Sequence, residues 1–76
     1  MNPEQKPKGE ILELHRVEEE TGFKPNQLVI HKVTMHRGRV KGYLKIDNRT
    51  LLGVDVSGMS DKVLDTPDKW EKLSDN

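Results

Sequence analysis

Histidine is the side chain most often used to bind transition metals, and the chain contains three of them. His31 and His36 are an odd number of positions apart, so on one β-strand they point to opposite faces and cannot chelate together. His15 and His31 share a face only if their two segments pair, and Glu13 is the only nearby carboxylate of the same parity. Two histidines without further ligands make a weak metal site, so we expect neither a metal nor another cofactor.

The other common catalytic arrangements are equally weak in this sequence. The serines lie in turn-like or terminal contexts, without a glycine-flanked nucleophile turn or a histidine predicted nearby. The carboxylates fall in a solvated run at residues 18–20 or in turn and cap positions, and the glycines do not form a phosphate-binding loop. We therefore expect a binding protein and not an enzyme.

The basic residues are concentrated in the middle of the chain. The net charge of the 76 residues is zero, but residues 29–49 contain six basic and one acidic side chain, a net +5, between flanks of −2 and −3. Chance clustering is the alternative explanation for a chain that is 34% charged. A local electropositive surface nevertheless favours an anionic partner.

The alternation of residues 29–46 predicts a β-hairpin that turns at Arg37-Gly38. In this register one face is almost entirely apolar and contains Val29, His31, Val33, Met35, Val40, Gly42, Leu44 and Ile46. The opposite face contains Ile30, Lys32, Thr34, His36, Arg39, Lys41, Tyr43 and Lys45. Because a shift by one residue inverts the faces of one strand, we expect this register to be well specified.

A second turn follows, for which two registers are possible. A three-residue loop at Asp47-Asn48-Arg49 sets Ile46 opposite Thr50, so that Lys41 faces Asp55 and Tyr43 covers Gly53. A two-residue loop at Asn48-Arg49 is the alternative, but it buries Asp55. The sequence therefore favours the longer loop.

The remaining segments are shorter. Residues 1–9 and 74–76 are polar and are predicted to be a disordered arm and tail. Residues 10–20 fit a strand or a short helix ending near Gly22, and the pattern L-x-[LI]-H-[RK]-V shared by residues 12–17 and 28–33 favours the strand. Phe23 is predicted to pack on the core. Further on, we expect an edge strand through Val63 and Leu64, a helix start at Thr66-Pro67-Asp68, and Trp70 with Leu73 closing an open end of the sheet.

Together these elements predict one mainly β domain over residues 10–73. We expect a small, strongly bent antiparallel sheet or open barrel of four to five strands, SH3-like or OB-like, with a short C-terminal helical turn. A chain of this length buries only about 60% of its unfolded surface, so its stability margin is thin. The absence of cysteine, of a membrane-spanning apolar run and of a leader at Met1 favours the cytoplasm and no membrane partner.

The basic hairpin face gives the functional hypothesis. Cations that track phosphates around one aromatic ring are typical of small nucleic-acid-binding barrels, so we expect an accessory or regulatory protein that binds RNA or DNA. The predicted contacts are Lys32, His36, Arg37, Arg39, Lys41, Tyr43, Lys45 and Arg49, with Tyr43 stacking on a base. The alternative is a protein-interaction module or inhibitor that docks an acidic partner on this face or pairs through an edge strand. The protein is expected to be a monomer or a weak homodimer.

Overall fold

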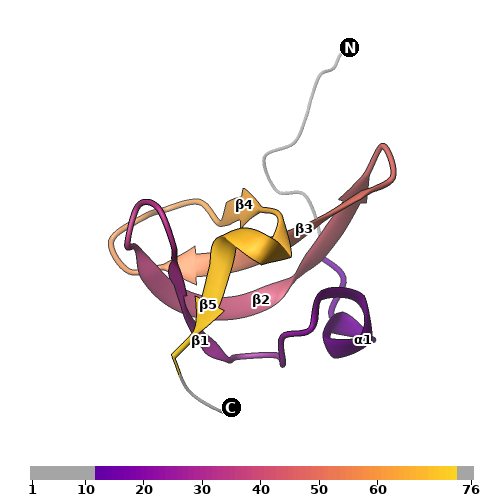
Figure 1. The fold of residues 1–76 in the computed structure, drawn as a ribbon, viewed down its shortest axis with the longest axis horizontal. Helices are drawn as coiled ribbons and strands as arrows, with labels where there is room; N and C mark the ends of the chain where they lie inside the picture. The colour runs from indigo at the N-terminus through magenta and orange to yellow at the C-terminus, as the bar shows by residue number, and fades with distance from the viewer. Residues whose placement is uncertain (1–11, 74–76) are drawn as a thin grey trace.

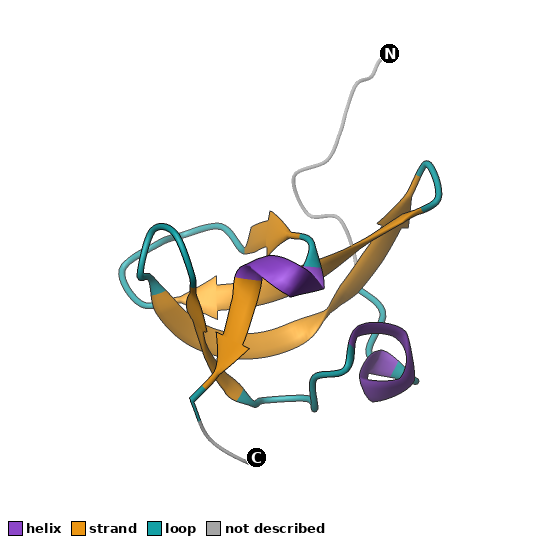
Figure 2. Ribbon diagram, in the orientation of Figure 1, coloured by secondary structure: helices purple, strands orange, loops and turns teal. Residues whose placement is uncertain are grey.

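Two hairpins that share one long strand form the centre of the fold (Figure 1). The computed structural model describes residues 12–73, in which five antiparallel strands make a single sheet of order β4-β3-β2-β1-β5. The strands are β1 (Leu28–His31), β2 (Arg37–Ile46), β3 (Arg49–Val56), β4 (Val63–Asp65) and β5 (Trp70–Lys72). A mainly β, antiparallel sheet of four to five strands is therefore confirmed, and this sheet is not closed (Figure 2). The predicted arm and tail at residues 1–9 and 74–76 lie outside the described residues.

The first hairpin turns earlier than the sequence predicted. Leu28 lies opposite Arg39, and Ile30 lies opposite Arg37, so the chain reverses over residues 32–35 and the predicted turn at Arg37-Gly38 is wrong. The imidazole of His31 explains the position of this turn. Its Nδ1 atom accepts hydrogen bonds from the backbone N–H groups of Val33 and Thr34, both at 3.2 Å. The side chain of a buried residue thus accepts two backbone N–H groups of the turn and fixes where the chain reverses.

A β-bulge at Lys41 inverts the faces of β2. The pairing with β3 shifts between Val40 and Gly42, so one extra residue of β2 is accommodated there. Val40 and Tyr43 consequently both point into the core, with 1% and 6% of their surface exposed, while Ile46 is 43% exposed. The predictions that Tyr43 lies on the outer face and Ile46 on the apolar face are wrong, because strict alternation fails at a bulge.

The second hairpin has a two-residue turn at Asp47-Asn48. Both residues have positive φ, 50° and 67°, as a turn that follows the twist of the strands requires. Ile46 lies opposite Arg49, so both predicted registers are wrong. As a result Arg39, and not Lys41, lies opposite Asp55.

The segment before β1 is mostly not a strand. Residues Val17–Thr21 form the short helix α1, which ends at Gly22 with φ 84°. Of the described residues before this helix, only Glu13 pairs with β2, through two 2.9 Å backbone hydrogen bonds to Tyr43. The strand predicted for residues 12–17 from the shared pattern is therefore wrong. The predicted burial of Phe23 is confirmed, because this side chain is 7% exposed.

The C-terminal segment closes the core beside β1. The predicted edge strand is β4, and a 3₁₀ turn at Pro67–Lys69 begins at the predicted proline. Trp70 is buried, as predicted, but it is the first residue of strand β5. Leu73 is 44% exposed and does not pack with Trp70 in the core, so this part of the prediction is wrong. The core itself consists of Val17, Phe23, Val29, Val40, Tyr43, Leu52, Val54, Val56 and Trp70. No helix in residues 12–73 has the length and apolar character needed to cross a membrane.

Candidate ligand-binding groove

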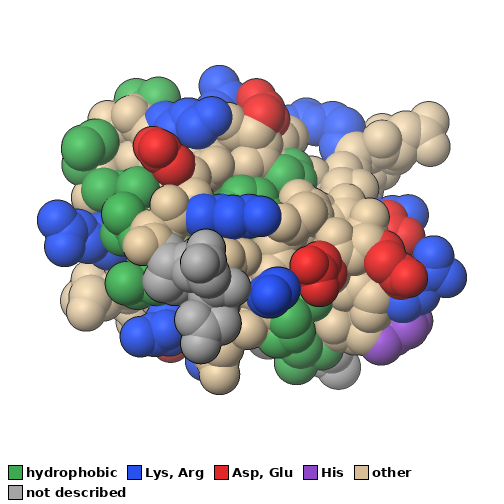
Figure 3. Space-filling view, turned by 60° about the horizontal axis from the view of Figure 1, so that its bottom comes forward, with side chains coloured by type: hydrophobic (Ala, Val, Ile, Leu, Met, Phe, Trp, Pro, Cys, Tyr) green, Lys and Arg blue, Asp and Glu red, His purple; other side chains and the backbone are tan. Residues whose placement is uncertain are grey.

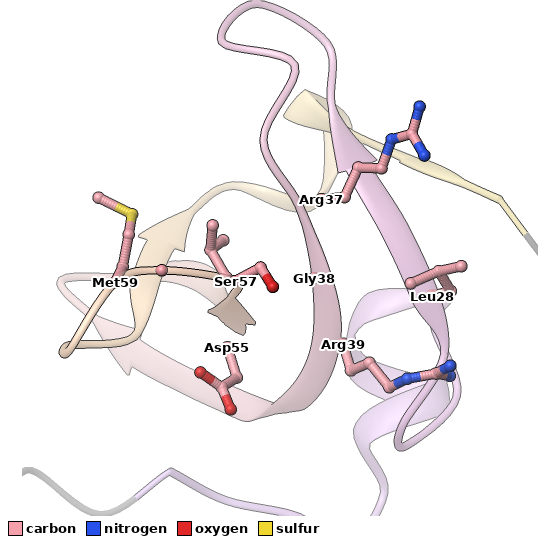
Figure 4. Close-up of a pocket in the computed structure, with 9 residues that line it drawn as sticks. Leu28, Arg37, Gly38, Arg39, Asp55, Ser57 and Met59 are labelled. Atoms are coloured by element: carbon pink, nitrogen blue, oxygen red, sulfur yellow. The ribbon is translucent and has the colours of Figure 1, made fainter.

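An open groove of about 550 Å³ lies where β1, β2 and the end of β3 meet. Figure 4 shows Leu28, Arg37 and Arg39 along one side and Asp55, Ser57 and Met59 along the other, with Gly38 between them. The remaining lining residues are Val56 and Gly58. The groove thus combines two cations, one carboxylate, a hydroxyl and apolar walls.

The local fold places both arginines on this side. Arg37 and Arg39 alternate with the buried residues Gly38 and Val40 in the part of β2 that precedes the bulge, so both side chains face outward. Gly38 leaves bare backbone between them. A Cβ atom at that position would collide with the Asp55 carbonyl oxygen and with a methyl group of Val54. Glycine is therefore needed at this position for β2 and β3 to approach each other.

The charges in the groove are largely uncompensated. The Arg37 guanidinium and the Asp55 carboxylate form no hydrogen bond or ion pair with any residue in the range 12–73. Arg39 lies opposite Asp55 in the sheet, but its Nη1 atom donates to the backbone carbonyl of Asn26 at 3.0 Å instead. Accordingly, Figure 4 shows both arginine side chains extending away from Asp55. Among the described residues, a guanidinium and a carboxylate of this groove are therefore both without a partner.

The structure separates the eight residues that the sequence predicted as one binding face. Lys32, His36 and Arg37 are exposed around the β1–β2 turn. Arg39 and Lys41 both bind Asn26, the latter through its amine to Oδ1 at 3.1 Å, so the predicted contact of Lys41 with Asp55 is wrong. Arg49 is exposed at the start of β3.

Lys45 lies at the other end of β2, where it meets helix α1. Its amine is 2.9 Å from Oε1 of Glu20. The hydrogen bond between them lowers the pKa of the Glu20 carboxyl and raises the pKa of the Lys45 amine. The pair therefore stays charged at neutral pH, and Lys45 already has a counterion.

Base stacking by Tyr43, as predicted, is incompatible with its position. All three aromatic residues of the chain are buried, with exposed fractions of 7% for Phe23, 6% for Tyr43 and 2% for Trp70. Figure 3 shows one face of the molecule, on which basic and acidic side chains are interspersed with apolar ones and form no continuous basic field. The described residues thus offer cations without an aromatic platform.

The groove residues that sequence reasoning missed are Leu28, Asp55, Ser57 and Met59. Their proximity to Arg37 and Arg39 depends on the register of both hairpins, which the alternation pattern predicted incorrectly. No local motif marks these residues. Only the turn at residues 32–35 and the bulge at Lys41 bring them to one groove.

A second polar cluster lies inside the protein, around His31. The imidazole Nε2 atom is 2.8 Å from Oδ2 of Asp65, and the ring meets Trp70 edge-on at a centroid distance of 4.8 Å. Since Nδ1 accepts two backbone N–H groups, the proton of the neutral ring must be on Nε2, from which it is donated to Asp65. This hydrogen bond, followed by that from the Thr66 N–H, lowers the pKa of the Asp65 carboxyl. Both ring nitrogens are occupied, so this histidine is not arranged as a general base.

The histidines also lie apart from one another. His15 is exposed beside Glu13, with 3.4 Å between Nδ1 and Oε1, whereas His31 is buried. Within residues 12–73 there is no group of three histidine or carboxylate side chains that could hold a metal ion. Comparison with protein-family models, with curated proteins and with solved structures finds no match to this chain.

Proposed function

We propose that this chain is a small, non-enzymatic protein-binding module that holds an extended segment of a partner protein in the groove between Arg37 and Asp55. The observation that carries the proposal is a pair of opposite charges, both without a partner in residues 12–73, in one groove with apolar walls. A polypeptide supplies the complementary groups, namely a carboxylate for Arg37, an amine or amide for Asp55, and apolar side chains for Leu28 and Met59.

The other ligand classes fit this groove less well. A nucleic acid presents the same negative charge at each phosphate, which Asp55 repels. Proline-rich helices dock on grooves lined by aromatic rings, and the aromatic residues here are buried. A mixed-charge peptide therefore satisfies more of the groove than either of them.

The arrangement of the strands supports an SH3-like rather than an OB-like architecture for this module. A long, bulged β2 pairs with β1 along its first part and with Glu13 further on, and a single 3₁₀ turn precedes the last strand. We propose that the protein acts in the cytoplasm, in accordance with its lack of cysteine, as a monomer or weak homodimer.

A selection from a displayed random nonapeptide library tests this function. The immobilised full chain is expected to enrich peptides, and each enriched peptide is expected to shift the backbone amide resonances of Leu28, Arg39 and residues 55–59. An Arg37→Glu variant of the protein should favour peptides with a basic residue where the unmodified protein favours an acidic one. Failure to enrich any peptide, or amide shifts confined to the opposite side of the sheet, would overturn the proposal.

Nucleic-acid binding is the second candidate, and the exposure of Lys32, His36 and Arg37 around the β1–β2 turn favours it. The two cations among them, Lys32 and Arg37, would give a slope of about −1.4 in log K against log salt concentration for a single strand. Titration of a single-stranded dodecanucleotide at low and moderate salt measures this slope. Strong, salt-dependent binding that is lost in Lys32→Ala with Arg37→Ala would replace the peptide with a nucleic acid as the ligand.

A further inference from the structure

The β1–β2 turn exposes two apolar side chains at its tip. Val33 is 73% exposed and Met35 is 62% exposed, the largest values among the exposed large hydrophobic residues of the described chain. Met35 also has a φ of 67°, which glycine and asparagine adopt far more readily than methionine. A glycine at position 35 and a polar residue at position 33 would suit both the backbone and the solvent better. The residues present are therefore unfavourable for the isolated domain.

The turn is nonetheless well ordered by hydrogen bonds. The N–H group of Met35 donates to the carbonyl of His31 at 2.9 Å, and the His31 N–H donates to the carbonyl of His36 at 2.8 Å. The imidazole of His31 binds the two intervening N–H groups, and Asp65 in turn holds this imidazole in place. A surface that is ordered before binding loses little conformational entropy when a partner arrives.

This apolar tip is joined to the groove by the chain, because the groove residue Arg37 lies two positions after Met35. Arg37 follows the turn in the chain, and its carbonyl accepts a hydrogen bond from the Ser57 N–H at 3.3 Å. This contact brings the β3–β4 loop, with its 45% exposed Met59, beside the start of β2. Figure 1 shows the β1–β2 turn and the β3–β4 loop at the same end of the sheet.

We propose that the turn is a second contact for the partner segment, in which Val33 and Met35 receive an apolar side chain while Arg37 pairs with an acidic side chain of the same segment. The inference rests on the proposed function and specifies its ligand as an acidic segment with an apolar anchor. Charge complementarity supports this choice, because the guanidinium between the tip and the groove has no partner in residues 12–73.

The backbone at position 35 allows binding to be separated from stability. Glycine adopts a φ of 67° without steric cost, so Met35→Gly should leave the unfolding midpoint unchanged or raise it. Val33→Ser removes a side chain that is mostly in water and should also leave the midpoint unchanged. The double variant is expected to bind a library-selected nonapeptide at least about tenfold more weakly, because it loses two apolar contacts.

Leu14→Ser is the matched control, since Leu14 is also a large, exposed apolar residue but lies in the segment before α1. Affinities for one fluorescent selected peptide are compared by polarisation. The inference is supported if only Val33→Ser with Met35→Gly weakens binding and if replacing the acidic residue of the peptide weakens it further. It is wrong if peptides are selected and shift the groove resonances but the double variant binds as tightly as the control. The proposed function itself fails if no peptide is selected or if the selected peptides shift only resonances on the opposite side of the sheet, so the two failures are distinguishable.

Discussion

Replacement of Asp65 by alanine tests the role of the buried histidine most directly. The variant leaves the Nε2–H group of His31, whose side chain is only 8% exposed, without its acceptor. An unsatisfied buried donor costs about 1–3 kcal/mol, and the lost bond from the Thr66 N–H adds to this cost. Because a domain of this size has a total stability of about 3–5 kcal/mol, we expect Asp65→Ala to lose a large fraction of it.

Urea unfolding followed by tryptophan fluorescence measures this loss. Trp70 is the single tryptophan of the chain and contacts the imidazole, so it reports on this network directly. Asp55→Ala is the control, because its carboxylate is exposed, binds no residue in the range 12–73, and should change the stability by less than about 0.5 kcal/mol. Asp65→Asn keeps one oxygen that accepts the hydrogen bond from Nε2–H of His31, but its side-chain NH2 group then faces the Thr66 N–H, and both are donors. The stability of this variant should therefore lie between those of the unmodified protein and Asp65→Ala.

The same variants predict a pH dependence. The pKa of Asp65 is lower in the folded protein than in the unfolded chain, so its contribution is present above the unfolded value and is lost as the pH falls through the folded value. The stability curves of the unmodified protein and Asp65→Ala should therefore converge at acid pH, below about 4. A loss of less than about 0.5 kcal/mol at neutral pH, equal losses in Asp65→Ala and Asp55→Ala, or parallel curves would refute the reasoning.

Two further substitutions test the backbone of β2 and its turn. Gly42→Ala should lower the thermal unfolding midpoint strongly, because Gly42 has a φ of 149° and faces the Glu13 backbone. Gly53→Ala should lower this midpoint less, because Gly53 faces the flexible Leu12 side chain. Similar thermal midpoints for the two variants would contradict this prediction. Asn48→Gly should raise the free energy of unfolding, measured in urea, by up to about 1 kcal/mol, because residue 48 has a φ of 67° in a two-residue hairpin turn. A destabilised variant would show that the asparagine side chain has another role.

The fold class was predictable because it depends on patterns within short stretches of sequence, and these patterns agree with the observed elements. Short apolar runs separated by turn residues correctly predicted the β sheet, the edge strand at Val63–Asp65, and the turn that begins at Pro67. Burial of Phe23 and Trp70 followed from their size and surroundings in the sequence. These properties do not require the exact pairing of strands.

The strand registers were not predictable from alternation alone. The first turn depends on a hydrogen bond between His31 and Asp65, which are 34 positions apart, and no local pattern reveals such a contact. The bulge at Lys41 then inverts the later part of β2, so Tyr43 enters the core. Of the groove residues, the sequence therefore predicted only the two arginines as binding residues. The carboxylate and the apolar walls could be identified only from the observed strand pairing.

The dependence of the first turn on Asp65 also constrains the order of folding. During synthesis the residues of β1 and β2 leave the ribosome well before β4, so the imidazole initially lacks its anchor. The tip around Val33 and Met35 should then be dynamic until the last third of the chain docks against β1 and β3. Formation of the proposed contact surface is thereby linked to completion of the whole sheet, and a nascent chain would form this surface only after that docking.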